Sequence, residues 1–131
     1  MRCLHCGVCC TETEMLLSAE DIERLEKKGY RKDFFTLFDD EGYARLRNLE
    51  NHCVFYDAER KRCMVYSCRP LGCRLYPVIH DSQKGIILDH VCRAVDKLNE
   101  KQIGQRGWKV LKLLERIDAQ AESRHNLPRA R

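Results

Sequence analysis

The sequence of 131 residues lacks any long hydrophobic run. A membrane-spanning helix needs roughly 20 consecutive apolar residues, whereas the longest apolar runs here are Gly85 to Leu88 and Val110 to Leu114. The N-terminal stretch also lacks the apolar segment of a secretory signal peptide, because His5, Gly7 and acidic residues interrupt it. We therefore expect a cytoplasmic protein whose thiols stay reduced and which has no membrane partner.

The sequence also lacks the short motifs of several enzyme classes. It contains no Gly-x-Gly-x-x-Gly, no phosphate-binding loop, no His-Glu-x-x-His and no Gly-x-Ser-x-Gly. These absences argue against a dedicated enzyme, although a small metal-dependent enzyme stays an alternative. No repeat or flexible linker divides the chain. We expect a single domain, with a cysteine-cluster part over 1–98 and a C-terminal helix over 99–131 packing on it.

Local patterns predict helices on either side of the cysteine-rich middle of the chain. One helix should begin after Ser18, which can cap it together with Asp21, and should end near Gly29. A second helix should start near Asn99. Its predicted buried face consists of Trp108, Leu111, Leu114 and Ile117.

Between these helices the patterns predict short strands and loops. Two apolar runs that start at Cys53 and Cys63 flank a polar turn, which predicts a hairpin that brings these two cysteines together. Further short strands are predicted at 43–50 and 85–92, and a tight loop at 68–77. The predicted fold class is α+β: a small cysteine-rich domain with a loop-held metal site, short hairpin strands and flanking helices.

Cysteine is the residue that the sequence has in excess. The nine cysteines are Cys3, Cys6, Cys9, Cys10, Cys53, Cys63, Cys68, Cys73 and Cys92. An odd number fits a disulfide framework poorly, and dense cysteines in a reducing compartment indicate metal or redox chemistry. The first three follow a C-x2-C-x2-C spacing, typical of loops around a [4Fe–4S] cluster whose fourth ligand is distant. A zinc site with one C-x2-C pair and a second pair from elsewhere is the alternative.

The positive charge of the sequence has two consequences. The formal net charge is +4, but metal-bound thiolates are negative, so a loaded protein comes close to neutrality and a nucleic-acid partner is not expected. Arginine is adjacent to four cysteines, at Arg62, Arg69, Arg74 and Arg93. Because a guanidinium favours the thiolate, we predict that Arg69 and Arg74 support the metal ligands from outside, mainly by bonding loop carbonyls.

These motifs together resemble a known family. CLHCGVCC is followed by C-x9-C-x-x-Y, then by RPLGCRLYP and a later cysteine. The combination is similar to the CxxCxxCC cysteine-cluster family, the YkgJ-type zinc- or iron-chelating domain, over residues 3–93. The resemblance implies metal binding through Cys3, Cys6, Cys9, Cys10, Cys53, Cys63, Cys73 and Cys92. Cys68 lies where the family pattern is variable, so we expect it to be no ligand.

Our leading hypothesis is a cysteine-ligated iron–sulfur protein, with a [4Fe–4S] cluster, that transfers electrons or assists redox chemistry or cluster assembly with a protein partner. The second is a structural module in which zinc holds the fold and the surface binds protein or nucleic acid. The third is a small metal-dependent enzyme.

Overall fold

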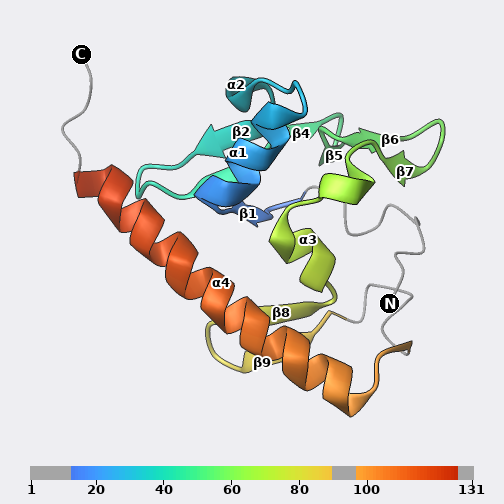
Figure 1. The fold of residues 1–131 in the computed structure, drawn as a ribbon, viewed down its shortest axis with the longest axis vertical. Helices are drawn as coiled ribbons and strands as arrows, with labels where there is room; N and C mark the ends of the chain where they lie inside the picture. The colour runs from blue at the N-terminus through green and yellow to red at the C-terminus, as the bar shows by residue number, and fades with distance from the viewer. Residues whose placement is uncertain (1–12, 90–96, 127–131) are drawn as a thin grey trace.

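A computed structural model describes residues 13–89 and 97–126 of the chain (Figure 1). In chain order the elements are β1 (Leu16–Leu17), α1 (Ala19–Lys27), α2 (Lys32–Phe35), β2 (Thr36–Phe38), β3 (Ala44–Leu46), β4 (Asn48–Leu49), β5 (His52–Cys53), β6 (Tyr56–Asp57), β7 (Arg62–Cys63), a 3₁₀ turn (Tyr66–Cys68), α3 (Leu71–Leu75), β8 (Val78–Asp81), β9 (Gly85–Leu88) and α4 (Glu100–Asn126). Short strands and helices of this kind make an α+β fold. None of the described helices has the length and apolar character needed to cross a membrane.

The first helix begins as the sequence predicts. The Ser18 hydroxyl accepts a hydrogen bond from Asp21 N, and the Asp21 carboxylate accepts one from Ser18 N, each at 3.1 Å. This reciprocal capping satisfies two backbone donors that a helix start leaves unpaired. Ile22 and Leu25 then face the core, and Gly29 follows the helix with φ +102°.

The strands are short and antiparallel. β3 is the centre of a three-stranded sheet in the order β1-β3-β2, with Leu16 and Leu37 both opposite Arg45. Three two-stranded ladders follow, β4 with β5, β6 with β7 and β8 with β9. The strand predicted at 43–50 forms as two shorter strands, β3 and β4, and the strand predicted at 85–92 forms as β9 over its first four residues, with 90–92 outside the described residues.

The segment predicted as a tight loop contains a helix. Pro70 occupies the residue before α3, and its carbonyl accepts hydrogen bonds from Cys73 N at 3.0 Å and Arg74 N at 3.2 Å. Proline is compatible with a helix start because its fixed φ suits the first turn and the N–H that it lacks has no partner there. The helix ends before Pro77, so it stays one turn long.

The buried side chains form two clusters. The first gathers α1, α2 and the neighbouring strands around Phe35 and Phe55, and it includes Cys53 and Cys68. The second joins α4 to α3 and β8 through Leu75, Val78 and Ile117. In Figure 1, α4 runs past α3 and the β8–β9 hairpin and ends near the loop between β2 and β3.

The C-terminal helix forms as predicted, but the prediction that Trp108 and Leu111 are buried is wrong. Trp108 is 62% exposed and Leu111 45%. The buried residues of α4 are Gly107, Val110, Leu113, Ile117 and Ala121. Successive helix residues are separated by about 100°, so the real contact face is turned away from Trp108. At Gly107 the helix comes so close to β9 that a Cβ would lie 3.1 Å from Cγ2 of Ile86. A search of the sequence for large apolar side chains does not identify such a contact.

Polar contacts also hold α4 against the rest of the molecule. The Tyr43 hydroxyl donates to Asp118 Oδ1 at 2.6 Å, and this hydrogen bond, with burial and nearby acidic charge, raises the pKa of Tyr43 to about 12. Gln120 Nε2 donates to Glu20 Oε1 at 2.8 Å, which lowers the pKa of Glu20. These bonds connect the helix to the residue before β3 and to the first turn of α1.

Replacing Gly42 with alanine should detach the end of α4. Gly42 has φ +92°, and a Cβ there would meet the backbone carbonyl of Ala121, which cannot yield as a side chain can. The matched control is Gly29→Ala, at φ +102° with nothing within 4 Å. We expect about 1 kcal/mol of destabilisation from Gly29→Ala through backbone strain alone, and about 1–3 kcal/mol more from Gly42→Ala, both measured by urea unfolding. Equal losses in the two variants would contradict this close contact.

Candidate metal centre

Four of the nine cysteines lie in the described part of the chain, and all four belong to one core cluster. Cys53 ends β5, Cys63 ends β7, Cys68 ends the 3₁₀ turn and Cys73 lies inside α3. Cys53 and Cys68 are buried at 7% and 6% exposure, while Cys63 and Cys73 are half-buried and pack against the same cluster. The other predicted ligands, Cys3, Cys6, Cys9, Cys10 and Cys92, lie outside the described residues.

The hairpin predicted around Cys63 forms, but it does not pair the two cysteines. Cys63 is opposite Tyr56, whereas Cys53 is opposite Asn48 in the β4–β5 ladder. A turn at 54–55 separates β5 from β6, so the chain changes partner between Cys53 and Tyr56. The two cysteines are therefore not cross-strand partners, although both belong to the same core cluster.

The described residues alone do not assemble a metal site. Over 13–89 and 97–126, no three histidine, cysteine, aspartate or glutamate side chains are close enough to hold one ion. The loop-held site that the sequence predicts stays a prediction, because the cysteines of CLHCGVCC are not among these residues.

The chain next to the N-terminal cluster is anchored beside Cys53. Thr13 N donates to Asn48 Oδ1, and Asn48 Nδ2 donates to Thr13 O, both at 2.9 Å. Asn48 is the residue that pairs with Cys53 across the β4–β5 ladder. The two hydrogen bonds therefore fix the backbone three residues after Cys10 to the strand pair that carries Cys53.

The chain next to Cys92 is anchored in the same way on the other side. Asp89 N donates to Pro77 O at 2.8 Å, and the Tyr76 hydroxyl donates to the Asp89 carboxylate. Tyr76 directly follows α3, the helix that contains Cys73. The backbone three residues before Cys92 is therefore held against the end of the Cys73 helix.

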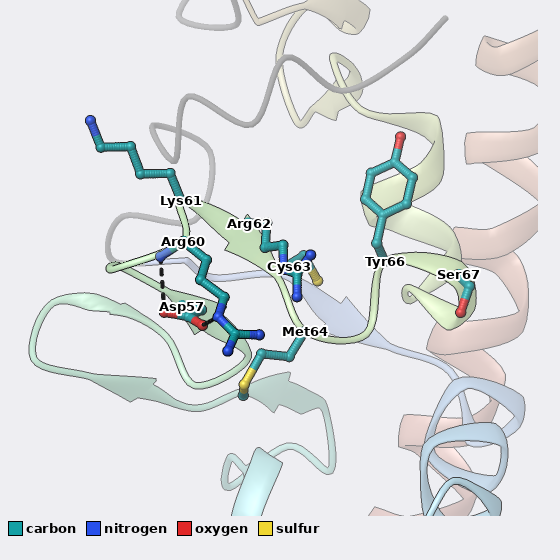
Figure 2. Close-up of a pocket in the computed structure, with 8 residues that line it drawn as sticks. All are labelled: Asp57, Arg60, Lys61, Arg62, Cys63, Met64, Tyr66 and Ser67. Carbon is teal, nitrogen blue, oxygen red and sulfur yellow. Dashed lines mark hydrogen bonds and ion pairs between the residues drawn. The ribbon is translucent and has the colours of Figure 1, made fainter.

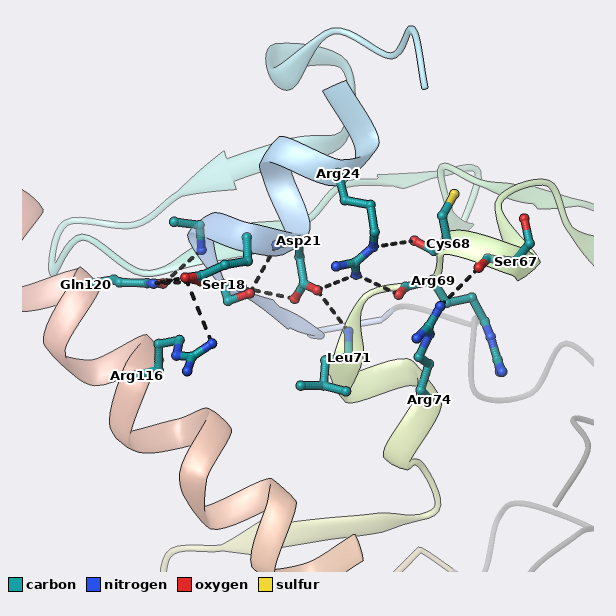
Figure 3. Close-up of polar contacts among 12 residues, drawn as sticks. Ser18, Asp21, Arg24, Ser67, Cys68, Arg69, Leu71, Arg74, Arg116 and Gln120 are labelled. Carbon is teal, nitrogen blue, oxygen red and sulfur yellow. Dashed lines mark hydrogen bonds and ion pairs between the residues drawn. The ribbon is translucent and has the colours of Figure 1, made fainter. Parts of the chain in front are cut away.

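The two arginines predicted as supporting residues bind carbonyls of the segment between Cys63 and Cys73. Arg69 Nε donates to Tyr66 O at 3.1 Å, and its guanidinium lies 4.0 Å from the centre of the Tyr66 ring. Arg74 Nη2 donates to Ser67 O at 3.0 Å (Figure 3). Arg106 of α4 donates to Arg74 O at 2.8 Å. These contacts fix the course of the segment and place two cations beside it.

A third arginine, which sequence reasoning missed, completes this arrangement from α1. Arg24 Nη2 donates to Arg69 O at 2.9 Å, and its Nε lies 3.5 Å from Cys68 O. The same guanidinium pairs with Asp21 Oδ1 at 2.6 Å, and this oxygen also accepts a hydrogen bond from Leu71 N at 3.0 Å (Figure 3). Asp21 and Arg24 therefore connect the first helix to the backbone at 68–71, where α3 begins.

Asp21 has two structural roles, and only the first, the capping of its own helix, is visible in the local sequence. One carboxylate oxygen caps its own helix through Ser18 N, while the other receives Arg24 and Leu71 N, 50 residues further along the chain. Its side chain is only 1% exposed. Three donors, one of them the Arg24 cation, compensate its burial, which is the condition for a charge inside a protein. A capping aspartate followed by arginine at i+3 was the only signal in the sequence.

Comparisons with known proteins identify the family of this chain. The family model CxxCxxCC, described as "Putative zinc- or iron-chelating domain", matches residues 2–93. An uncharacterised protein of Methanocaldococcus jannaschii is 32% identical over 85 residues, which are 58% of this chain and 43% of that protein. This chain therefore matches less than half of its relative's length. No solved structure matches. The match over most of its length shows that the chain belongs to the CxxCxxCC family of zinc- or iron-chelating domains.

Proposed function

We propose that this protein holds a metal centre on cysteine thiolates, and that the centre is an iron–sulfur cluster, [4Fe–4S], in preference to zinc. The proposed ligands are Cys3, Cys6, Cys9, Cys10, Cys53, Cys63, Cys73 and Cys92. The proposed use is electron transfer, or an accessory role in redox chemistry or cluster assembly, with a protein partner in the cytoplasm. We propose no nucleic-acid partner. We also propose that the chain is a single domain, in which a cysteine-cluster part over 1–98 carries the C-terminal helix over 99–131.

The anchoring of the two chain segments carries this proposal. Three residues of extended chain span at most about 11 Å. Cys10 is therefore within about that distance of Thr13, which is bonded beside Cys53, and Cys92 is within about that distance of Asp89, which is bonded beside the Cys73 helix. The bonds at Thr13 and Asp89 support a centre that takes ligands from both ends of the family pattern, because each residue is only three positions from a proposed ligand.

The donor set and its surroundings suit a sulfur-rich metal centre. Thiolates are the ligands of iron–sulfur clusters and of structural zinc. Arg24, Arg69 and Arg74 supply positive charge beside the segment that joins Cys63 to Cys73, and their carbonyl bonds hold it in one conformation. A bound cluster supplies one-electron redox chemistry, and the surrounding hydrogen bonds and charges set its potential. The proposed task of Arg69 and Arg74 is this outer support.

Metal analysis of protein purified without oxygen tests the proposal. We expect a brown protein with broad visible absorption, and iron and acid-labile sulfide in equal amounts. A colourless protein that contains zinc would contradict the iron–sulfur assignment and establish the second hypothesis. A protein that contains neither metal under these conditions would contradict cysteine ligation altogether.

The zinc module remains the second candidate, and a specific observation favours it. The described cysteines belong to the principal hydrophobic cluster, not to a peripheral loop. A metal ion at this position would cross-link the core of a small domain, and such binding contributes of order 10 kcal/mol to folding in small zinc modules. A metal-dependent enzyme is the third candidate and has no observation of its own.

A further inference from the structure

The turn of the β6–β7 hairpin presents three consecutive cations. Asp57 Oδ1 accepts hydrogen bonds from Glu59 N at 3.0 Å and Arg60 N at 3.2 Å, which fixes the start of the turn. Lys61 has φ +51°, a left-handed conformation that completes it. Arg60, Lys61 and Arg62 are all exposed. The turn therefore projects positive charge from a well-defined backbone (Figure 2).

These cations border an open hollow of about 750 Å³ next to a proposed metal ligand. Its lining consists of Asp57, Arg60, Lys61, Arg62, Cys63, Met64, Tyr66 and Ser67. Cys63 is half-buried at its edge, and Met64 is 49% exposed. The hollow thus combines a basic rim, one exposed apolar side chain and a thiol from the proposed ligand set.

Little of this positive charge is neutralised by ion pairs with the described residues. Asp57 is the one acid of the lining, and its Oδ2 lies 3.8 Å from Arg60 Nε while its Oδ1 is occupied by the turn. Lys61 and Arg62 form no ion pair with any described residue. The hollow therefore carries a net positive potential that attracts an anionic partner.

We propose that this hollow is the docking surface for an acidic patch on a partner protein, at the edge of the metal centre. The inference rests on the proposed function, because a partner bound here would lie beside the metal centre only if Cys63 is one of its ligands. Small-molecule pockets are mostly apolar and enclosed, whereas this hollow is open and six of its eight lining residues have polar or charged side chains. A DNA-binding protein that makes roughly 6–10 phosphate contacts uses more cations than the three of this hairpin. Small, electrostatically steered interfaces are typical of transient redox complexes.

The test compares two variants that lose the same charge. Arg60→Gln/Lys61→Gln/Arg62→Gln removes the rim, and Lys101→Gln/Lys109→Gln/Lys112→Gln removes three exposed cations of α4. The probe is a fluorescein-labelled peptide of alternating aspartate and glutamate, followed by fluorescence anisotropy at low salt. We expect the rim variant to bind it about tenfold more weakly and the α4 variant less than about twofold.

Three outcomes would overturn the docking surface: no binding by the unmodified protein, equal weakening in both variants, or tighter binding of a single-stranded oligonucleotide of the same net charge. Metal content, measured on the unmodified protein and both variants, keeps this proposal separate from the first one. A metal-free protein would refute the proposed function, while the comparison of the two variants would still decide whether the rim binds acidic surfaces.

Discussion

Replacing Arg24 with methionine should destabilise the protein by about 3 kcal/mol. The substitution keeps much of the apolar stem but removes the guanidinium, which leaves the buried carboxylate of Asp21 without its cation. Removing one partner of a fully buried ion pair costs about 3–5 kcal/mol. We expect the lower end because Arg24 is 36% exposed and because Ser18 N and Leu71 N still bond the carboxylate. Urea unfolding of the metal-loaded protein measures the loss.

The same variant should release metal faster. Arg24 bonds the carbonyls of Cys68 and Arg69, so its loss frees the segment between Cys63 and Cys73. The control is Lys27→Met, on the same helix, whose exposed pair with Glu23 is worth less than about 0.5 kcal/mol. If both variants unfold at the same urea concentration and lose metal to a chelator at the same rate, then Asp21 and Arg24 do not position this segment.

Cys53→Ala and Cys68→Ala should differ greatly in metal content although they remove the same buried group. The two cysteines are matched in burial, at 7% and 6% exposure, and belong to the same cluster, so the packing loss is similar, about 1 kcal/mol each. Only Cys53 is a proposed ligand. We therefore expect Cys53→Ala to lose the metal that it helps to hold, together with the folding free energy from binding, and Cys68→Ala to keep a full complement.

Metal analysis and thermal unfolding of the two variants, purified in parallel without oxygen, measure the difference. Loss of metal in Cys68→Ala would show that the proposed ligand set omits a ligand. Retention of all metal in Cys53→Ala would remove Cys53 from that set. In either case the cysteines of CLHCGVCC become the next positions to replace.

Several elements of the fold were predictable because their signals are local. Ser18 and Asp21 define the start of α1 within four residues of sequence, and the hairpin at β6 and β7 follows from two apolar runs around a polar turn. The one-turn helix α3 was missed because Pro70 and Gly72 are read as loop residues, although proline is compatible with a helix start.

The buried face of α4 was mispredicted for a different reason. Hydrophobic size marks Trp108 as a core residue, but the helix contacts its neighbours through Gly107 and Ala121, where small side chains allow close approach. Which face of an amphipathic helix is buried depends on the shape of the surface that it meets. That surface is built from α3, β8 and β9, remote in sequence from the helix itself.

The sequence by itself determined the family and, through it, the eight cysteines proposed as ligands, because cysteines at fixed spacings can be recognised without a structure. It also determined the capped first helix, since capping involves neighbours in the chain. Only the tertiary structure decided that Asp21 and Arg24 hold the backbone at 68–71, that Thr13 and Asp89 are bonded beside Cys53 and the Cys73 helix, and that the hairpin cations border a hollow at Cys63. These contacts join residues up to 50 positions apart, and no local preference specifies such a distance.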